Sequence, residues 1–319
     1  MIPTYNRKDL LAQCLRGLLR QTRPLDEIVV IDNASTDNTE DKVRAEFGAS
    51  VTYLRLAENT GSAGGFHEGI KLAYEHGHDW IWCMDNDAIP LEDTLQKLLD
   101  AESPSAGHVV AKACWHTDPL TGERRPGSVR VDFNKGRYLY PNPADCSGRV
   151  IPVDCAPWAG LLINSEVIPR AGFPKVDMFS WADDHAFCFE LRKFGEILLV
   201  GTTTLFHPGL RSRVATVKRL GRDRVRIEEY WKVYYGTRNK LYVGRLYFKS
   251  QWRTVLKFLA SYMRGLLSIL LLDDFKLYRV RILTRGIVDG FTGRLGKRVH
   301  PNDFRGQQGS RTPQAPTAP

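Results

Sequence analysis

The chain has 319 residues, of which 43% are hydrophobic, so it is long enough to form one large α/β domain with an appendage. Its six cysteines are scattered without a Cys-x-x-Cys pair, and this pattern indicates neither a zinc site nor a disulfide framework. The first ten residues lack the apolar segment of a secretory signal, so we expect a cytoplasmic protein.

The net charge of +9 divides unevenly along the chain. Residues 1–210 hold 21 lysine and arginine residues against 29 acidic ones, whereas residues 211–319 hold 24 against 7. An acidic part is suited to hold a cation and hydroxyl-rich groups, while a basic part is attracted to phosphates on lipids, nucleic acid or a diphosphate-bearing substrate. A surface that only keeps the protein soluble is the alternative. No aromatic and basic platform accompanies the charge, so we expect no nucleic-acid partner.

Strand-like and helix-like segments alternate over the first 115 residues. The predicted elements are a strand at 1–6, a helix at 8–21, a strand at 27–32, a helix at 39–47, a strand at 51–56, a helix at 65–76 and a strand at 80–84. This alternation is typical of a parallel sheet covered by helices. Polar clusters follow four of the strands, at residues 4–7, 32–33, 59–65 and 85–87. Because ligands collect at the carboxyl ends of such strands, we expect the four clusters to converge on one crevice.

The cluster at 85–87 reads Asp-Asn-Asp and follows a short apolar run. In an extended backbone Asp85 and Asp87 point to the same side, whereas Asn86 points away. A divalent cation removes the repulsion between two neighbouring carboxylates, and oxygen ligands suit Mg²⁺ or Mn²⁺. A solvated turn after a strand is the alternative interpretation.

The second half of the chain is less regular. Residues 116–150 are rich in glycine, proline and charge and predict an excursion or irregular hairpin over the crevice. Strand character resumes at 153–168, a helix is predicted from about Asp184, and a strand over 196–206 precedes His207. Residues 222–289 are predicted to be helical and basic. Within them the apolar run 253–272 is interrupted by Lys257 and Arg264, which favours an interfacial or packed helix over a spanning one.

The segments Ile-Pro-Thr-Tyr-Asn-Arg at 2–7 and Val-Val-Ile-Asp-Asn-Ala-Ser-Thr-Asp-Asn-Thr at 29–39 together resemble the opening of family 2 glycosyltransferases of the GT-A fold. The resemblance implies a Rossmann-like, mostly parallel nucleotide-binding sheet. It also implies a donor pocket in which Asp32 accepts a hydrogen bond from a uracil or thymine ring N–H. The implied lining of that pocket is Thr4, Tyr5, Asn6, Arg7, Asp32 and Asn33. An Asx-rich turn that caps the next helix at Thr36 or Asn38 explains part of the same pattern.

The glycine-rich segment at 59–70 does not match the Gly-x-Gly-x-x-Gly pattern of dehydrogenases. It resembles the Asn-x-Gly-x-x-Gly-Gly stretch of the rhamnosyl- and galactofuranosyltransferase-like branch of family 2. The resemblance implies that Asn59, Gly64 and Gly65 border the nucleotide sugar, since glycine lets backbone N–H groups approach it.

The same resemblance assigns roles to the acidic cluster and to His207. Asp85 is implied to lie against the ribose and donor sugar, and Asp85, Asp87 and His207 to form the site of a divalent cation, Mn²⁺ or Mg²⁺. Such a cation stabilises the charge on a departing nucleoside diphosphate. A purely structural histidine is the alternative for His207. Arg211 and Arg213 are further candidates to hold the diphosphate.

The segment Trp-Ala-Asp-Asp-His-Ala-Phe at 181–187 resembles the acceptor side of the same enzymes. Asp184 is implied to be the catalytic base that takes a proton from the acceptor hydroxyl, and Trp181 and Asp183 to bind the acceptor. The roles of the two aspartates are open to exchange, and acids that stabilise a helix start are the alternative.

The sequence departs from the family pattern after this pair. It holds Ala186 and Glu190 where an acid and an arginine are usual, and whether His185 substitutes for them is open. The segment Tyr-Tyr-Gly-Thr-Arg-Asn-Lys-Leu-Tyr at 234–242 resembles a stretch that follows the catalytic domain in the same branch. Core packing is its simplest role.

We therefore expect a GT-A catalytic domain at 1–215, with a nucleotide-sugar half to about 115 and an acceptor half from about 116. A basic helical extension at 216–300 and a disordered tail at 301–319 follow. The resemblance implies inverting, metal-dependent transfer of galactofuranose or rhamnose from a UDP- or dTDP-sugar to a lipid-linked or cell-envelope glycan. The extension is expected to hold the protein peripherally at the anionic inner face of the cell membrane.

A catalytically silent domain of the same fold, acting as a membrane-associated scaffold, is the alternative. The family's first strand normally begins several residues before Ile2. We therefore expect either a natural start upstream of Met1 or an initiator methionine in place of a valine.

Overall fold

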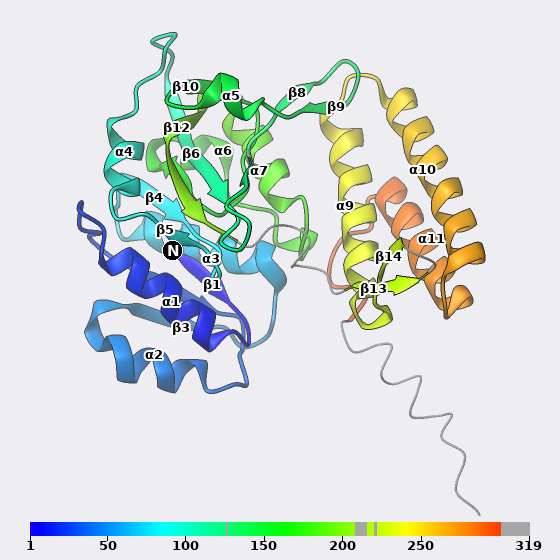
Figure 1. Cartoon of the computed structure of the whole chain (residues 1–319), viewed down its shortest axis with the longest axis horizontal. Coiled ribbons are helices and arrows are strands. Elements are labelled where there is room, and N and C mark those ends of the chain that lie inside the picture. The colour runs from blue at the N-terminus through cyan, green and yellow to red at the C-terminus, as the bar shows by residue number, and fades with distance from the viewer. Residues whose placement is uncertain (126, 208–215, 220–221, 301–319) are drawn as a thin grey trace, which may run out of the picture.

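The computed structural model describes residues 1–125, 127–207, 216–219 and 222–300. A sheet with helices on both sides forms the first two thirds of these residues, and three long helices stand beside it (Figure 1). The tail predicted at 301–319 lies outside the described residues, as do Arg211 and Arg213.

The first part of the chain alternates strands and helices as predicted. Its elements are β1 (Ile2–Thr4), α1 (Lys8–Leu19), β2 (Val29–Asp32), α2 (Thr39–Phe47), a 3₁₀ turn (Gly48–Ser50), β3 (Thr52–Arg55), α3 (Gly61–Glu75) and β4 (Trp80–Cys83). The start predicted for the third helix was wrong, because α3 begins at Gly61 rather than Gly65. Glycine is a poor helix former, which hides this start in the sequence; here the Asn59 side chain accepts a hydrogen bond from the Gly61 N–H at 2.8 Å.

Strands β1, β2 and β3 are parallel, with Thr4 opposite Asp32 and Asp32 opposite Arg55. Met1 joins this group to β4, since its amino group donates to the Trp82 carbonyl at 2.7 Å and its carbonyl accepts from the Met84 N–H at 3.1 Å. The carboxyl ends of the four strands therefore share one edge, which is the edge that the polar clusters follow.

The second part of the sheet is mixed. Its elements are β5 (Ile89–Pro90), α4 (Thr94–Asp100), β6 (Val109–Thr117), β7 (Arg124–Arg125), β8 (Arg130–Asp132), β9 (Arg137–Leu139), α5 (Pro143–Cys146), β10 (Val150–Val153), β11 (Leu161–Asn164), a 3₁₀ turn (Ser165–Val167), α6 (Ile168–Ala171), a second 3₁₀ turn (Val176–Met178), α7 (Asp183–Leu191) and β12 (Glu196–Phe206). The strand order is β10-β12-β6-β11-β4, and only β6 and β12 are parallel in it. The expectation of a mostly parallel sheet thus holds for the nucleotide half alone.

Both faces of the sheet are covered by apolar side chains. Leu11, Leu15 and Leu18 recur at the spacing of one helix face, so α1 buries this stripe against one side of the sheet. Phe66 of α3 stacks on Trp158 on the other side, with ring centroids 4.4 Å apart. These two cores fix the strands whose ends carry the polar clusters.

The last part consists of a hairpin and three helices. Its elements are β13 (Thr216–Arg219), β14 (Arg222–Val225), a 3₁₀ turn (Ile227–Glu229), α9 (Tyr230–Tyr247), α10 (Gln251–Leu272) and α11 (Lys276–Thr292). The helix predicted from Arg222 was wrong for the first residues, which pair with β13. Gly290 brings α11 close to α9, because a Cβ atom there would lie 2.6 Å from the Arg238 carbonyl oxygen. Helix α10 lies on the outer side of this bundle (Figure 1).

Candidate active site

Two carboxylates and one imidazole meet at the ends of β4 and β12. The His207 Nε2 atom lies 3.3 Å from the Asp85 Oδ2 atom and 3.3 Å from the Asp87 Oδ1 atom. Potential ligand atoms of all three residues lie within 4.8 Å of one another. A mixed set of carboxylate oxygens and imidazole nitrogen suits Mn²⁺ or Mg²⁺, so the residues present fit the expected cation.

Local backbone bonds explain how these side chains meet. The Ala88 N–H donates to the Asp85 carbonyl at 3.1 Å, so a turn replaces the extended tip assumed from the sequence. Both carboxylates nevertheless face His207, while the Asn86 side chain turns away and donates to Thr4 Oγ1 at 3.2 Å. The His207 N–H donates to the Thr117 carbonyl, which holds the histidine at the end of the β12–β6 ladder.

Arg7 also reaches this cluster. Its guanidinium donates to Asp87 Oδ2 at 3.0 Å, although its side chain is 43% exposed. Thr4 is buried, whereas Tyr5 is 44% exposed at the rim. The structure therefore brings Arg7 to the candidate cation site and Thr4 to the neighbouring Asn86, and both were predicted to line the donor pocket.

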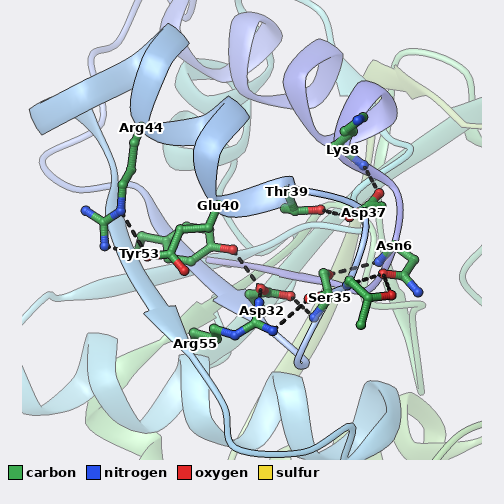
Figure 2. Close-up of polar contacts among 11 residues, drawn as sticks. Asn6, Lys8, Asp32, Ser35, Asp37, Thr39, Glu40, Arg44, Tyr53 and Arg55 are labelled. Carbon is green, nitrogen blue, oxygen red and sulfur yellow. Dashed lines mark hydrogen bonds and ion pairs between the residues drawn. The ribbon is translucent and has the colours of Figure 1, made fainter.

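Asp32 is the centre of a second polar cluster, at the end of β2 (Figure 2). Its side chain is fully buried, and Oδ1 accepts a hydrogen bond from the Ser35 N–H at 2.9 Å. Oδ2 accepts from the Tyr53 hydroxyl and the Arg55 guanidinium, both at 2.7 Å. Burial and the Asp32 charge raise the pKa of Tyr53, so its hydroxyl remains a donor. The sequence interpretation missed Tyr53 and Arg55, although the parallel register places Arg55 directly opposite Asp32.

The turn after β2 connects this cluster to the first strand (Figure 2). The Asn6 N–H donates to Ser35 Oγ at 2.9 Å, and the Asn6 side-chain oxygen accepts from the Thr36 N–H at 2.6 Å. Asn38, one of the two predicted caps, is the residue before α2, but its side chain makes no capping bond. The turn is thus held by Asn6 from a neighbouring strand end rather than by a helix cap.

Asn33, Gly64 and Gly65 form a packed support beneath the crevice. Asn33 Oδ1 accepts from the Thr60 hydroxyl at 2.9 Å, and Asn33 Nδ2 donates to the Gly61 carbonyl at 3.2 Å. A Cβ atom at Gly65 would lie 2.6 Å from Pro3, and one at Gly64 would lie 2.1 Å from the Thr60 hydroxyl. Gly65 lets α3 approach the sheet closely, and Gly64 leaves room for the Thr60 side chain at the start of α3. The predicted contact of these glycines with a nucleotide sugar stays a prediction.

The two aspartates at the start of α7 have different surroundings. Asp183 is buried, and its Oδ2 atom accepts from the Trp158 indole N–H at 2.9 Å and from the Ser62 hydroxyl at 3.3 Å. Burial and the neighbouring Asp184 charge raise the pKa of Asp183 to about 7, and the charge of Asp85 adds to the effect. Asp184 is partly exposed and accepts from the His185 N–H at 2.8 Å. Asp184 is therefore the member of the pair that solvent reaches more easily.

In this chain α7 is anchored by contacts that do not involve the acid and the arginine usual in the family. Glu190 accepts from the Tyr247 hydroxyl of α9 at 2.6 Å, and Arg192 pairs with Asp154 at 2.8 Å. His185 Nδ1 lies 3.3 Å from the Tyr138 hydroxyl, and burial lowers the pKa of His185 to about 4. The neutral His185 thus contacts the β8–β9 hairpin and adds no charge to the acidic pair at neutral pH.

The segment at 234–242, which resembles a stretch that follows the catalytic domain in the family, holds the loop before α7. Asn239 of α9 is buried, and its Nδ2 donates to the carbonyls of Met178, Ser180 and Trp181 at 2.7 to 2.8 Å. Arg238 is also buried and donates to the Met178 carbonyl at 2.8 Å. The sequence analysis offered only core packing for these two residues.

The loop that Arg238 and Asn239 hold is unusual in its backbone. Phe179, Trp181 and Ala182 have φ angles of 61°, 73° and 60°, in the left-handed region that non-glycine residues rarely adopt. Such a conformation persists when its surroundings fix it. The bonds from α9 supply that restraint immediately before the acidic pair.

A groove of about 580 Å³ continues from this loop into the helical bundle. Trp181 lies at its wall, together with Phe258, Tyr262 and Leu283, and the ammonium-bearing side chains of Lys232 and Lys240 also line it. The groove is thus largely apolar, although it also carries the charged side chains of Lys232, Lys240 and Asp223, and it borders Trp181 shortly before helix α7.

Comparison with known proteins places this arrangement in a family. The sequence model described as "Glycosyl transferase family 2" matches residues 1–160. Galactofuranosyltransferase GlfT1 of Mycolicibacterium smegmatis is 30% identical over 188 residues, which cover 58% of this chain and 61% of the relative. Undecaprenyl-phosphate mannosyltransferase of Micrococcus luteus is 35% identical over 142 residues, or 44% of this chain and 53% of the relative. The chain thus spans about three fifths of the length of the first of these relatives.

Solved structures show the same fold. The mannosyltransferase PcManGT of Pyrobaculum calidifontis, in complex with GDP-Man and Mn²⁺, aligns over 97% of this chain and 78% of its own with a TM-score of 0.51 and 16% identity. GalNAc-T7 with UDP, GalNAc and Mn²⁺ aligns over 65% of this chain and 42% of its own with a TM-score of 0.50 and 14% identity. The α/β architecture is GT-A-like, as the sequence predicted. The chain belongs to glycosyl transferase family 2.

Proposed function

We propose that this chain is an inverting, metal-dependent glycosyltransferase that moves a sugar from a nucleoside-diphosphate sugar to an acceptor hydroxyl. The observation that carries the proposal is the convergence of Asp85, Asp87 and His207 at the ends of β4 and β12, with their ligand atoms within 4.8 Å. A divalent cation bound there would neutralise charge on a departing nucleoside diphosphate. Family membership supports the same reaction class.

The remaining site residues fit complementary roles. Asp32 is fixed in direction by Tyr53 and Arg55, and we assign to it the recognition of a uracil or thymine ring N–H. Asp184 is the proposed base, because it is the more exposed of the two acids, and buried Asp183 is placed in acceptor binding. A single base, Asp184, fits a single displacement with inversion, which is also what the family resemblance implies.

The proposed donor is a UDP- or dTDP-sugar, with galactofuranose or rhamnose as the sugar. The name of the mycobacterial relative, a galactofuranosyltransferase, supports the first of these sugars. One fold neighbour binds UDP and the other binds GDP-Man, so experiment must decide which nucleotide the donor of this chain carries.

The proposed acceptor is a lipid-linked or cell-envelope glycan. The groove beside Trp181 supports it, since apolar walls suit a lipid chain and Lys240 suits its phosphate, whereas Lys232 is paired with Glu229. The name of the relative from Micrococcus luteus includes undecaprenyl phosphate, a lipid phosphate, which supports an acceptor that carries a lipid chain.

We further propose that α10 docks on an anionic membrane surface. This helix has the length and apolar composition to cross a membrane, and only 6% of its most apolar window is buried. Its exposed apolar side chains recur along one helix face, at Trp252, Leu256, Leu259, Met263, Leu267, Leu270 and Leu271. Because Arg253, Lys257 and Arg264 interrupt the same helix, an interfacial position is favoured over a spanning one.

Vesicle binding tests this docking. The triple substitution of Leu259, Met263 and Leu267 by Gln is expected to abolish sedimentation with phosphatidylglycerol vesicles without lowering thermal stability, since these side chains are exposed. Leu120→Gln, at a site that is 94% exposed near β7, is the control and should bind as the native chain does. If the native chain resists alkaline carbonate extraction from membranes, α10 spans the bilayer and the interfacial proposal fails.

Calorimetric titration of UDP with and without Mn²⁺ tests the cation site. We expect Mn²⁺ to increase the UDP affinity by at least about tenfold, roughly 1.4 kcal/mol, and His207→Ala to remove most of that increase. His108→Ala is the matched control, because His108 is exposed on another part of the sheet. Equal UDP affinity with and without Mn²⁺ would contradict the proposed metal dependence.

A further inference from the structure

A second group of metal-ligating side chains lies away from the candidate active site. Glu27 Oε2 is 2.9 Å from His76 Nδ1 and 2.7 Å from His78 Nε2. Potential ligand atoms of the three residues lie within 4.8 Å of one another. Glu27 lies two residues before β2, and His78 lies two residues before β4. The group is therefore at the amino ends of these strands, whereas Asp32 and Asp85 are at their carboxyl ends.

The backbone brings the two histidines to the same carboxylate. His76 follows the last residue of α3, and Gly77 reverses the chain with a φ angle of +80°. No atom lies within 4 Å of the position of a Cβ atom at Gly77, so the glycine is explained by its conformation rather than by packing. This left-handed turn lets His76 and His78 approach Glu27 from one side.

The surroundings of the group resemble those of a metal site. The Thr52 hydroxyl donates to Glu27 Oε1 at 2.6 Å, which orients the carboxylate and leaves Oε2 toward the imidazoles. A cavity of about 680 Å³ borders the group, and Asp26 also lines it. Water therefore has room to complete a coordination sphere on the open side.

We propose that Glu27, His76 and His78 form a Zn²⁺ site that joins the end of α3 to the amino end of β2. Two imidazoles and one carboxylate with a fourth, solvent-facing position are a ligand set that Zn²⁺ favours, whereas Mg²⁺ prefers oxygen ligands. The cysteine pattern had indicated no zinc site, and the site proposed here uses no cysteine, since all six cysteines are buried and its ligands are two imidazoles and a carboxylate. The site is independent of the proposed glycosyl transfer, since it lies at the opposite end of the strands.

The alternative is a network in which both imidazoles donate N–H groups to Glu27 without any ion. Hydrogen bonds from Thr52, His76 and His78 outweigh burial and lower the pKa of Glu27 to about 2, so this carboxylate is charged in either case. The two states differ in the protonation of the imidazole nitrogens of His76 and His78 that face Glu27. A hydrogen-bonded network needs a proton on each bonded nitrogen, whereas a zinc site needs its lone pair.

Zinc titration of tag-free, demetallated protein distinguishes the two states. The parent for the titration is His207→Ala in excess Mg²⁺, which suppresses zinc binding at the cluster of Asp85 and Asp87. We expect this parent to bind one Zn²⁺ by calorimetry and to melt at a higher temperature with Zn²⁺ present. Adding His76→Ala and His78→Ala should weaken binding by more than roughly 100-fold, whereas adding the control His108→Ala should leave it unchanged.

A single additional substitution guards against a folding defect in the double-histidine variant. Glu27→Gln keeps an oxygen that accepts from Thr52 but removes the charged ligand, so its zinc affinity should fall while its circular dichroism spectrum stays native. The proposal is overturned if the parent binds no Zn²⁺, or if either the folded double-histidine variant or Glu27→Gln binds Zn²⁺ as tightly as the parent.

Discussion

Adjacent residues with the same side chain can differ in chemistry, and Asp183 and Asp184 are an example. Asp183 is buried against Trp158 and Ser62, while Asp184 is partly exposed. A buried carboxyl is harder to ionise, particularly beside a second carboxylate. The pair therefore separates into one acid that is held by buried partners and one that solvent reaches more easily.

Asp183 should make stability depend on pH. Its folded-state pKa of about 7 lies above the ordinary value of 3.8. Between these two pH values the folded state therefore keeps a proton that the unfolded state has already released. The stabilisation that this proton supplies is complete below about pH 4 and is lost as the pH rises through about 7. Asp183→Asn removes the ionisation and keeps an oxygen for the Trp158 N–H, so the variant should gain stability relative to the native chain as the pH rises.

Urea unfolding at about pH 5 and about pH 8, in the presence of a chelator, measures this effect. The difference in unfolding free energy between Asp183→Asn and the native chain should increase toward the higher pH, whereas Asp184→Asn should show a smaller change. A difference that is the same at both pH values would show that Asp183 titrates normally.

The same residue scale shows what the sequence could predict. Alternation along a strand predicted that Asp85 and Asp87 share a side, whereas their meeting with His207 was predicted from the family resemblance. Trp158, which donates to Asp183, and Arg55, which donates to Asp32, were missed because their partners lie far away in the sequence. Only the register of β2 against β3 offered a signal for Arg55.

Helix α9 is the element that most changes the interpretation of the chain. It was expected to belong to an extension that begins at 216, yet its Asn239 side chain bonds three carbonyls of the loop before α7. The expected domain boundary at 215 stays a prediction. It separates α9 from the loop before α7, although the two are joined by these hydrogen bonds. Resemblance alone marked the Tyr-Tyr-Gly-Thr-Arg-Asn segment, because no local pattern reveals which distant carbonyls a side chain will reach.

Loss of the Asn239 amide should loosen that loop. Asn239→Ala removes a donor from the partly buried carbonyl oxygens of Ser180 and Trp181, while the Met178 carbonyl keeps Arg238 as a donor. We expect the variant to lower the free energy of unfolding by about 1 to 3 kcal/mol. If transfer activity is present, the Michaelis constant for the acceptor should rise more than that for the donor. Asn134→Ala, in the exposed turn between β8 and β9, is the control for urea unfolding. A loss below about 0.5 kcal/mol would mean that the loop does not depend on α9.

The parallel half of the sheet was predictable because alternating strands and helices permit few arrangements. The mixed half was not, since β11 inserts between β4 and β6 with antiparallel pairing on both sides. Nothing in the apolar run at 161–164 indicates the direction of its neighbours. The β13–β14 hairpin was missed because its charged residues fit a helix surface equally well.

At the scale of the whole molecule, charge and apolar exposure divide the chain in the same way. The acidic part of the sequence forms the sheet with the proposed donor site, and the basic part forms the helices with exposed α10. The groove beside Trp181 lies between these helices and the loop before α7. This arrangement would let an acceptor held at a membrane surface reach Asp184 while a soluble donor enters from the sheet.

Sugar transfer across a panel of UDP- and dTDP-sugars with Mn²⁺, comparing the native chain with Asp184→Ala, tests the central claim most directly. The account predicts turnover of at least one donor by the native chain. In Asp184→Ala it predicts a loss of roughly 10²- to 10⁴-fold while Mn²⁺-dependent UDP binding persists. Tight, Mn²⁺-dependent UDP binding without turnover of any donor would contradict it and favour a catalytically silent scaffold.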